Sequence, residues 1–553
     1  MISLLPLPQS VSFSDGLFVL RAGMAVEACT ELERVATWLT TAVGRAGVPL
    51  TPVSAGEESR ANRAVGVRLT VAEDLPAEAY RLDVDANGIG ISGGDEAGVF
   101  YGAQALLQLL PERVFRSAAV ADVESMSVPF SQIRDEPRFG WRGVLLDVAR
   151  HFMPKHDLLR FIDLMAMHRL NLLHLHLTDD QGWRVEIVSR PGLTEIGGWR
   201  AESQVGPPPH SPVNGRPHGG FYTQDDIREI VAYARQRFIE IVPEIDIPGH
   251  SRAAIAAYPE LGIGVGDDAS ATPAPAVATT WGVHPEVLNL EDSTVQFFRD
   301  VFTEIMDLFP SAYIGLGGDE CPTDLWREDA RTQELMRARG IASEDGAREW
   351  FVEQIAEHII ARGRRPYGWD ELLEGTPPPG TVVASWRGMR GALAGVRRGY
   401  DVVACPDDKA YLDYRQSDDP DEPIPFGALL SLRDTYSFEP IPADATPEEA
   451  RRVLGGQANL WTEHMDSPRT VDYYAYPRLC AIAEVLWSRR RATFEAFSAR
   501  LDDHLRRLDA LGVEYRRPTG PLPWQRRPEV EGQPLTAEQH AEHVAALVSG
   551  IAV

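Results

Sequence analysis

Between residues 141 and 461 the sequence repeats one pattern, in which a short apolar run is followed by a longer amphipathic stretch. Strands buried on both faces form continuous apolar runs, and right-handed crossovers place helices between successive parallel strands. This repetition favours an α/β fold built on a parallel sheet. Eight runs fit buried strands, and they cover residues 141–148, 171–177, 239–247, 313–318, 365–369, 381–386, 401–405 and 457–461.

The stretches between these runs supply the helices of such a fold. Eight strand and helix units in about 350 residues predict a (β/α)8 TIM barrel with insertions. A doubly wound open sheet is the alternative, but no run resembles its glycine-rich phosphate turn. A ninth run, residues 287–290, is assigned to an insertion after the third strand. Helical periodicity covers residues 155–168, 224–238, 295–309, 344–362 and 389–399.

The first 135 residues combine short strand patterns with two helical stretches, at residues 31–46 and 98–110. A hairpin is expected over residues 80–84 and 88–92, because an Asn-Gly turn accepts positive φ at both central positions. Residues 123–136 contain a proline and several charges and are interpreted as a linker. The predicted organisation is an α+β domain over residues 1–135, a barrel over residues 136–515 and a tail over residues 516–553.

Irregular segments interrupt the barrel pattern. Residues 195–219 and 416–446 are rich in Pro, Gly, Ser and Asp and are expected as loops over one barrel face, and residues 256–286 form a third insertion. Helices are expected near residues 493–511 and, at the end of the tail, over residues 537–548.

Composition excludes several classes of partner. A net charge of −27 and a pI near 5.0 repel polyanions, so neither nucleic acid nor an anionic membrane surface is expected, and a neutral ligand fits best. Four scattered cysteines give neither a disulfide framework nor zinc-ligand spacing. The first residues lack the basic and apolar regions of a signal peptide, and no run approaches the roughly 20 apolar residues of a membrane span. A cytoplasmic location is therefore expected.

The fourth run ends in the tetrapeptide Gly-Gly-Asp-Glu, at residues 317–320, which places two carboxylates where a buried strand leaves the barrel. The same tetrapeptide occurs at residues 93–96, directly before a helical pattern, and there Asp95 is expected to cap the helix. The tetrapeptide alone is therefore no evidence for a site. Whether residues 317–320 belong to one depends on the residues at the ends of the other strands.

Polar and aromatic residues recur where the other runs end. The carboxyl ends of the strands of a barrel meet at one face, on which barrel enzymes carry their sites. Carboxylates accept hydrogen bonds from sugar hydroxyls, and tryptophan faces stack on the C–H face of a pyranose. The pattern indicates a site for a neutral sugar, built from Asp147, Arg150, His151, Asp179, Asp180, His250, Asp319, Glu320, Trp369, Trp386, Asp413, Trp461 and Glu463.

Each of these residues also has a simpler interpretation. A strand-end acid often caps a helix or pairs with a base, a tryptophan often packs in a core, and a single histidine is more often structural than catalytic. His250 follows a turn that aims it across the mouth of the barrel, which favours a role in the site. Acids and aromatic residues at so many strand ends together favour a site over separate structural roles.

Two other chemistries compete with a sugar site. His174 and His176 have the H-x-H spacing of metal-dependent barrel hydrolases, but they lie inside the second run, and no later His-plus-Asp set completes the ligands. Neither a metal nor another cofactor is therefore expected. Cys321 could be a nucleophile with His250 as its base, but nothing in the sequence supplies an oxyanion hole, so a small buried thiol is favoured.

Five motifs follow one another in a fixed order. They are Asp-Val-Ala-Arg-His-Phe at 147–152, His-Leu-Thr-Asp-Asp-Gln-Gly-Trp-Arg at 176–184, Pro-Glu-Ile-Asp-Ile-Pro-Gly-His at 243–250, Gly-Leu-Gly-Gly-Asp-Glu at 315–320 and Leu-Trp-Thr-Glu at 460–463. Together they resemble the β-N-acetylhexosaminidases of glycoside hydrolase family 20. The resemblance spans residues 80 to 490, approximately, and implies a small α+β domain before a (β/α)8 barrel. It also implies exo-hydrolysis of terminal β-linked GlcNAc or GalNAc, with retention.

The adjacent carboxylates agree with this resemblance. Neighbouring residues leaving a strand tend to point to opposite sides, so Asp319 and Glu320 cannot easily form the facing pair, about 5–5.5 Å apart, of ordinary retaining glycosidases. One acid facing the leaving oxygen suits a substrate that supplies its own nucleophile. Family 20 is such an exception, in which the 2-acetamido oxygen attacks C1 and gives an oxazolinium intermediate.

The resemblance implies a role for each matching residue. Glu320 would be the general acid and then the base, Asp319 would orient the acetamido N–H, and Tyr411 would bond the acetamido oxygen. Asp179, or alternatively Asp180, would support Glu320 together with His250. We also expect a raised pKa for Glu320, because a proton donor at neutral pH needs one and an anionic neighbour would help to raise it. The sugar would be held by Arg150, Trp369, Trp386, Asp413, Trp461 and Glu463.

Overall fold

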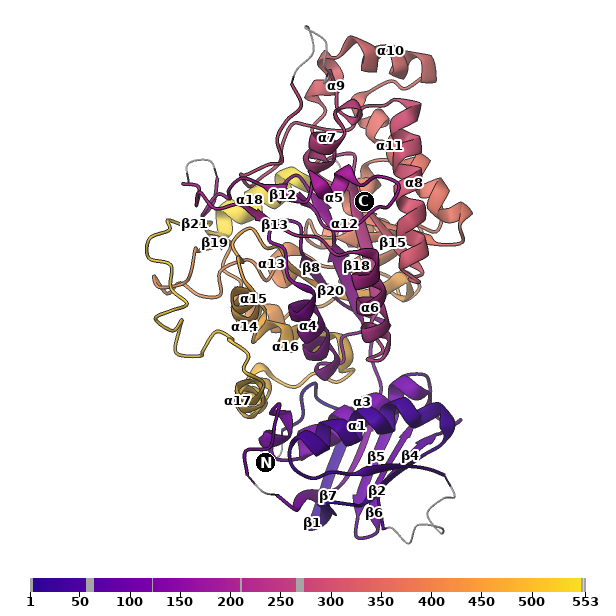
Figure 1. The fold of residues 1–553 in the computed structure, drawn as a ribbon, viewed down its shortest axis with the longest axis vertical. Coiled ribbons are helices and arrows are strands. Elements are labelled where there is room, and N and C mark those ends of the chain that lie inside the picture. Colours follow the sequence, from indigo (N-terminus) through magenta and orange to yellow (C-terminus); the bar gives the residue numbers. More distant parts are fainter. Residues whose placement is uncertain are drawn as a thin grey trace.

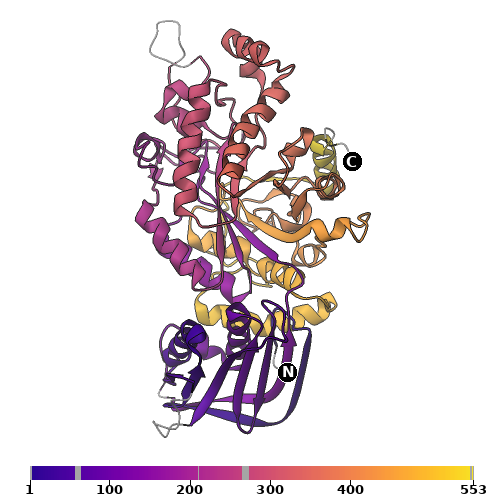
Figure 2. The same ribbon diagram turned by 90° about the vertical axis from the view of Figure 1, so that its right-hand side faces the viewer.

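The computed structural model describes residues 3–55, 64–121, 123–208, 211–264, 273–548 and 551. Two bodies are stacked along the long axis of the molecule (Figure 1): a sheet domain at the N-terminal end and a larger barrel beyond it. The view at 90° shows the same stacking (Figure 2). The expected fold, a small α+β domain followed by a (β/α)8 barrel, is confirmed. The boundaries expected at residues 135 and 515 stay a prediction.

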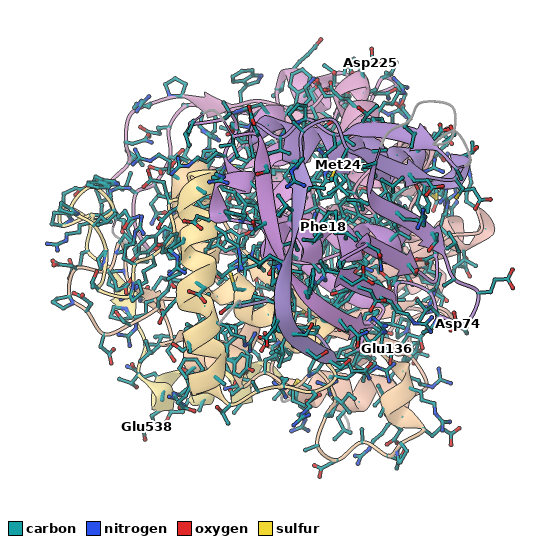
Figure 3. The ribbon with its side chains drawn as sticks, turned by 90° about the horizontal axis from the view of Figure 1, so that it is seen from below. Phe18, Met24, Asp74, Glu136, Asp225 and Glu538 are labelled. Atoms are coloured by element: carbon teal, nitrogen blue, oxygen red, sulfur yellow. The ribbon has the colours of Figure 1, made fainter. Side chains whose placement is uncertain are left out.

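The N-terminal domain is a seven-stranded mixed sheet with helices α1 (Glu33–Arg45) and α3 (Glu96–Leu109) on the face toward the barrel (Figure 1). Viewed from below, the sheet lies in front, with Phe18 and Met24 labelled on it (Figure 3). In spatial order its strands are β1 (Ser10–Arg21), β7 (Ser125–Asp135), β5 (Tyr80–Asp85), β6 (Gly88–Gly93), β4 (Val65–Val71), β2 (Ala25–Ala28) and β3 (Thr51–Ser54).

The expected hairpin is formed by β5 and β6, but its turn differs from the expectation. Asp85 pairs with Gly88, so the two loop residues are Ala86 and Asn87. Gly88 has a φ of 144° and begins the second strand, whereas the positive φ expected at Asn87 is wrong. The Asp85 carboxylate accepts the backbone N–H of Asn87 at 2.7 Å, and this bond fixes the turn one residue earlier than an Asn-Gly turn would lie.

The interpretation of residues 123–136 as a linker is wrong. Most of this segment is strand β7, which pairs with both β1 and β5 inside the sheet. The internal Pro129 is tolerated because it lies beside a break in the register of β1, where the ladder is already interrupted. Met126, Val128 and Ile133 are buried, as the core-facing residues of an alternating strand should be.

All eight apolar runs are strands of one closed barrel, in which neighbouring strands are parallel. The run at residues 287–290 is buried but irregular, in agreement with its assignment to an insertion. In order around the barrel the strands are β8 (Trp141–Asp147), β9 (Leu172–His176), β14 (Glu240–Ile247), β15 (Tyr313–Gly317), β16 (Arg365–Trp369), β17 (Val382–Ser385), β18 (Asp401–Ala404) and β20 (Val453–Leu460).

The five expected barrel helices are present, and two of them begin at a side-chain cap. Helix α6 begins with a capping box between Thr223 and Asp226, and the Ser343 side chain caps α11. Each helix packs an apolar face on the barrel. The five are α4 (Lys155–Met167), α6 (Gln224–Arg235), α8 (Asp292–Leu308), α11 (Glu344–Ala361) and α12 (Met389–Arg397).

A buried polar network joins the N-terminal domain to the closed end of the barrel. Asp135 accepts hydrogen bonds from the Trp487 indole at 2.8 Å and from the Tyr80 hydroxyl at 3.0 Å. The Tyr80 hydroxyl also accepts one from Arg169 at 3.1 Å, and Arg142 donates to Glu78 at 2.6 Å. Because these groups are paired across the junction and all but the partly exposed Glu78 are buried, they fix one relative placement of the two domains.

The last two described helices lie at opposite ends of the barrel. Helix α17 (Phe494–Leu511) lies near the N-terminal domain, whereas α18 (Ala537–Leu547) lies beside the loops at the other end (Figure 1). Both helices were expected. The insertions add the short strands β12 (Trp199–Arg200), β13 (His218–Gly219) and β19 (Phe426–Gly427) beside these loops, and α14 (Leu432–Tyr436), which packs against α17 through Tyr436 and Phe497.

Part of the third insertion, residues 265–272, lies outside the described residues. Over the part of the chain that the structure describes, no helix combines the length and apolar character needed to cross a membrane. The expected cytoplasmic location stays a prediction.

Candidate active site

The end of β15 has a backbone that requires glycine. Gly317 and Gly318 have φ angles of 69° and 93°, and a Cβ on Gly317 would lie 1.7 Å from the Asp246 carboxylate. That carboxylate accepts the Gly318 backbone N–H at 3.2 Å. Glu320 itself has a φ of 43°, which is strained for a residue with a side chain. The glycines thus turn the chain so that Asp319 and Glu320 enter the mouth of the barrel.

The second copy of the tetrapeptide has the role expected of it. The Asp95 carboxylate accepts the backbone N–H of Gly98 at 2.8 Å and caps α3. The two copies therefore share a sequence but not a function.

A pocket of about 180 Å³ opens where the barrel strands end. Tyr414 and Phe426 were not predicted but contribute to its wall. His250 and Asp179 lie behind the lining and are buried. The predicted residues that line the pocket are Arg150, Asp319, Glu320, Trp369, Trp386, Tyr411, Asp413, Trp461 and Glu463.

Aromatic rings form the sides of this pocket. Trp369 and Trp461 have their ring centroids 5.7 Å apart, with planes inclined at 44°. Trp386 and Tyr411 are stacked at 5.9 Å. The Arg150 guanidinium lies 5.1 Å from the centre of the Trp461 ring, so a cation–π contact fixes both. Flat aromatic walls, combined with the charged groups that share the lining, suit one sugar ring with its hydroxyls.

His250 connects the adjacent acids to a buried carboxylate. Its Nδ1 lies 3.2 Å from Asp179, and its Nε2 lies 3.6 Å from Glu320 and 3.8 Å from Asp319. Asp179 is also paired with Arg150 at 2.8 Å. This chain of contacts orients the imidazole toward the two strand-end acids.

Asp179 and Asp180 differ in their partners. Asp180 lies 3.6 Å from the His250 Nδ1 and accepts the backbone N–H of Arg252 at 3.0 Å, which ties it to the loop. Asp179 is closer to the imidazole and also contacts Arg150 and His176. The geometry favours Asp179 as the supporting acid.

The H-x-H histidines lie inside the barrel and are satisfied by protein groups. Glu244 is 2.6 Å from His176 Nδ1 and 2.9 Å from His174 Nε2, and His176 Nε2 is 2.9 Å from Asp179. Among the described residues, His176, Asp179 and Asp246 are close enough to share an ion. His176 is bonded to both Asp179 and Glu244, and the Asp246 carboxylate accepts the Gly318 backbone N–H, so protein contacts account for the cluster.

Cys321 is poorly suited to nucleophilic catalysis. Burial raises the pKa of its thiol to about 12, so the thiol stays protonated near neutral pH. The interpretation as a small structural thiol is favoured.

The pKa values of the two adjacent acids differ from the expectation: Asp319, and not Glu320, has the raised pKa. Burial, with the Glu320 charge adding to it, raises the pKa of Asp319 to about 6. The pKa of Glu320 is lowered instead: burial acts to raise it, but the contact with His250 outweighs burial. The Asp319 side chain is 13% exposed and that of Glu320 is 38% exposed, so Asp319 bears more of the desolvation. The raised pKa expected for Glu320 is therefore wrong for the ligand-free site.

The comparisons with known proteins agree with this geometry. The family model described as glycosyl hydrolase family 20, catalytic domain, matches residues 139–490, and the model for domain 2 of the same family matches residues 1–136. The chain belongs to glycosyl hydrolase family 20. The family resemblance seen in the motifs is confirmed.

Individual relatives of this family 20 chain carry related names. A beta-hexosaminidase from Porphyromonas gingivalis is 39% identical over 94% of the chain, which spans 64% of that relative's length. A beta-N-acetylhexosaminidase from Cellulomonas fimi is 33% identical, with 93% of this chain and 96% of the relative covered. The crystal structure of an exo beta-N-acetylglucosaminidase from Vibrio harveyi with N-acetylglucosamine has a TM-score of 0.80 and 33% identity, and the match covers 93% of this chain and 78% of that one.

Some residues around the family 20 pocket were not predicted. The Trp386 indole donates to Glu371 at 3.2 Å, and burial, together with Asp370, raises the pKa of Glu371 well above its usual value. Its position at the end of the fifth strand was a usable signal. Tyr414 follows Asp413 directly and could also have been inferred, whereas Phe426 lies in an insertion and carried no signal.

Proposed function

We propose that this protein hydrolyses terminal, non-reducing β-linked N-acetylhexosaminides with retention, using the substrate's acetamido group as the nucleophile. One observation carries the proposal: an aromatic pocket ends on two adjacent carboxylates, of which Asp319 is the more buried and Glu320 the more exposed. Such a pair suits one proton donor and one orienting group. The names of the relatives support the same substrate class.

The first step breaks the bond between C1 and the leaving oxygen. The acetamido oxygen attacks C1 while Glu320 gives its proton to the leaving oxygen, which departs as an alcohol. Asp319 accepts the acetamido N–H and so stabilises the positive charge of the oxazolinium ion. The Tyr411 hydroxyl donates to the acetamido oxygen and holds it below C1.

The second step restores the sugar. Water attacks C1 from the side that the leaving group vacated, Glu320 takes a proton from it, and the bond between C1 and the acetamido oxygen breaks. Two inversions at C1 give net retention. His250 and Asp179 keep Glu320 in place through both steps.

The remaining pocket residues bind the sugar. Arg150, Asp413 and Glu463 offer hydrogen-bonding groups for its hydroxyls, and burial raises the pKa of Asp413 well above its usual value, with Glu463 adding to the effect. The three tryptophans Trp369, Trp386 and Trp461 enclose the ring and the acetamido methyl group.

Substrate binding also explains how Glu320 can become the acid. The acetamido N–H favours the charged form of Asp319, and an anionic Asp319 disfavours the charged form of Glu320. The sugar also removes water from Glu320. The proton that Asp319 holds in the free site therefore passes to Glu320 in the complex.

Aryl β-glycosides test this function directly. The protein should hydrolyse the GlcNAc or GalNAc glycoside, whereas the glucoside, which lacks the acetamide, should not be turned over. Comparable turnover of the glucoside would contradict the proposal. Activity that survives exhaustive chelation would exclude the metal hydrolase.

A further inference from the structure

The chain beyond residue 490, where the match to the catalytic-domain model ends, returns to the loops beside β19 (Figure 1). Strand β21 (Gln533–Pro534) pairs with β19, and the backbone N–H of Leu535 donates to the Gly427 carbonyl at 2.9 Å. Phe426 of β19 lines the pocket. The pairing of β21 with β19 therefore holds Phe426, which is part of the pocket wall, in position.

Helix α18 is docked through a histidine. His540 is the one residue buried within this helix, all of which the structure describes. Its Nε2 lies 2.6 Å from the Asp407 carboxylate, and the two side chains are 9% and 1% exposed. This buried pair anchors the first half of the helix, whereas Val544 and Leu547 in its second half are only partly buried against the core.

Asp407 in turn connects two sides of the pocket. It begins α13 (Asp407–Ala410), which is followed directly by Tyr411, and its backbone N–H donates to the Trp386 carbonyl at 2.9 Å. Its carboxylate accepts the Tyr414 hydroxyl at 3.4 Å. Tyr414 also meets the His540 ring edge-on, at a centroid distance of 5.8 Å. His540 thus contacts both the acid and the aromatic ring that hold this loop.

The other end of α18 is attached to the barrel as well. Arg387 donates to the Leu547 carbonyl at 2.9 Å and to the Asp370 carboxylate at 2.8 Å. A cation at the carboxyl end of a helix satisfies its free carbonyl groups. Arg387 directly follows Trp386, so this attachment also lies beside the pocket.

We propose that residues 533–548 form the outer support of the sugar pocket, and that His540 is a positioning residue that holds the loop from Asp407 to Tyr414 in its substrate-binding arrangement. The inference rests on the proposed function, because that function assigns Tyr411 and Asp413 of this loop to the substrate. Loss of the His540 contact lets the loop shift while the two acids that follow β15, Asp319 and Glu320, stay in place.

The test compares three full-length variants in the hydrolysis of an aryl β-GlcNAc glycoside. His540→Ala should lower kcat/KM about tenfold or more and raise KM, since a hydrogen bond to a charged group contributes about 1.5–3 kcal/mol. His540→Gln keeps an N–H donor for Asp407 and should restore most of the loss. His543→Ala is the matched control, because His543 is exposed on the same helix, and it should match the wild type.

The outcomes separate positioning from folding. A smaller folded fraction lowers the apparent kcat but leaves KM unchanged, so an unchanged KM in His540→Ala would overturn the inference. Equal kcat and KM values for His540→Ala and His543→Ala would overturn the inference too. In both of these cases an active wild type leaves the proposed function intact. An inactive wild type would instead overturn the proposed function and this inference with it.

Discussion

At the scale of single residues, Asp319 and Glu320 show how neighbours in sequence acquire different chemistry. Gly317 and Gly318 turn the backbone so that both carboxyl groups line the pocket, with Asp319 the less exposed of the two. The pKa of Asp319 is about 6, and that of Glu320 is lowered by His250. One proton is therefore available to the pair near pH 6, and substrate binding decides which residue carries it.

The first prediction concerns Glu320→Gln. An amide cannot donate a proton to the leaving oxygen, so kcat should fall by about 10²–10⁴. In the wild type, kcat/KM should fall as the pH rises through about 6, because the proton of the pair, held on Asp319 in the free site, is then lost. Below that pH the proton is present. The residual activity of Glu320→Gln should lack this basic limb in its pH–rate profile, and persistence of the limb would show that Glu320 is not the acid.

The second prediction concerns Asp319→Asn and the acetamido group. A thiazoline inhibitor resembles the oxazolinium ion, and its ring nitrogen should be bonded by the Asp319 carboxylate. Loss of a hydrogen bond with a charged partner should weaken binding about tenfold or more. Calorimetry measures the affinity, with a sugar inhibitor that lacks the acetamide as the control. Equal affinity of wild type and variant for the thiazoline would refute the orienting role.

At the scale of elements, the glycine-rich end of β15 should be the least tolerant part of the site. Gly317→Ala combines a positive φ, at about 1–2 kcal/mol, with a clash against Asp246, so the loss of unfolding free energy should exceed that figure and activity should fall. Gly340→Ala is the matched control, because Gly340 has a similar φ of 72° but open space around it. Denaturant unfolding of both variants checks this, and similar losses in the two would show that the clash with Asp246 is unimportant.

Elements were predictable where periodicity alone decides them. The eight barrel strands and their helices follow from the apolar runs, because a short continuous apolar run is typical of a strand that is buried on both faces. Strand β7 was mistaken for a linker because Pro129 signals a break, and only its pairing with an interrupted part of β1 explains why it is tolerated. The hairpin turn shifted because Asp85 competes for the Asn87 N–H, which an Asn-Gly pattern does not reveal.

Most predicted site residues line one pocket, with His250 and Asp179 behind it, because a barrel brings its strand ends together. A correct order of strands was sufficient to predict this. Which of the two acids has the raised pKa was not predictable, because it depends on how deeply each carboxyl group is buried and on how far each lies from His250. Phe426 and the tail contacts were also missed, because they come from insertions whose course the sequence pattern does not set.

At the scale of the whole molecule, the polar junction should hold the two domains together. Asp135→Ala leaves the Trp487 indole and the Tyr80 hydroxyl without their acceptor, and breaking such a buried network should cost about 3–5 kcal/mol of unfolding free energy. Asp83→Ala is the control, because its exposed pair with Arg134 should contribute no more than about 1 kcal/mol. Denaturant unfolding measures both, and equal effects would mean that the junction is not a stabilising network.

The central claim is that the substrate's acetamido oxygen forms the bond to C1. Aryl β-GlcNAc glycosides with zero, one, two or three fluorines on the acetamido methyl group test it most directly, because each fluorine makes that oxygen a weaker nucleophile with little change in size. The account predicts that kcat falls steeply with each added fluorine. A kcat that does not change across the series would contradict it, since the nucleophile would then belong to the protein or to water.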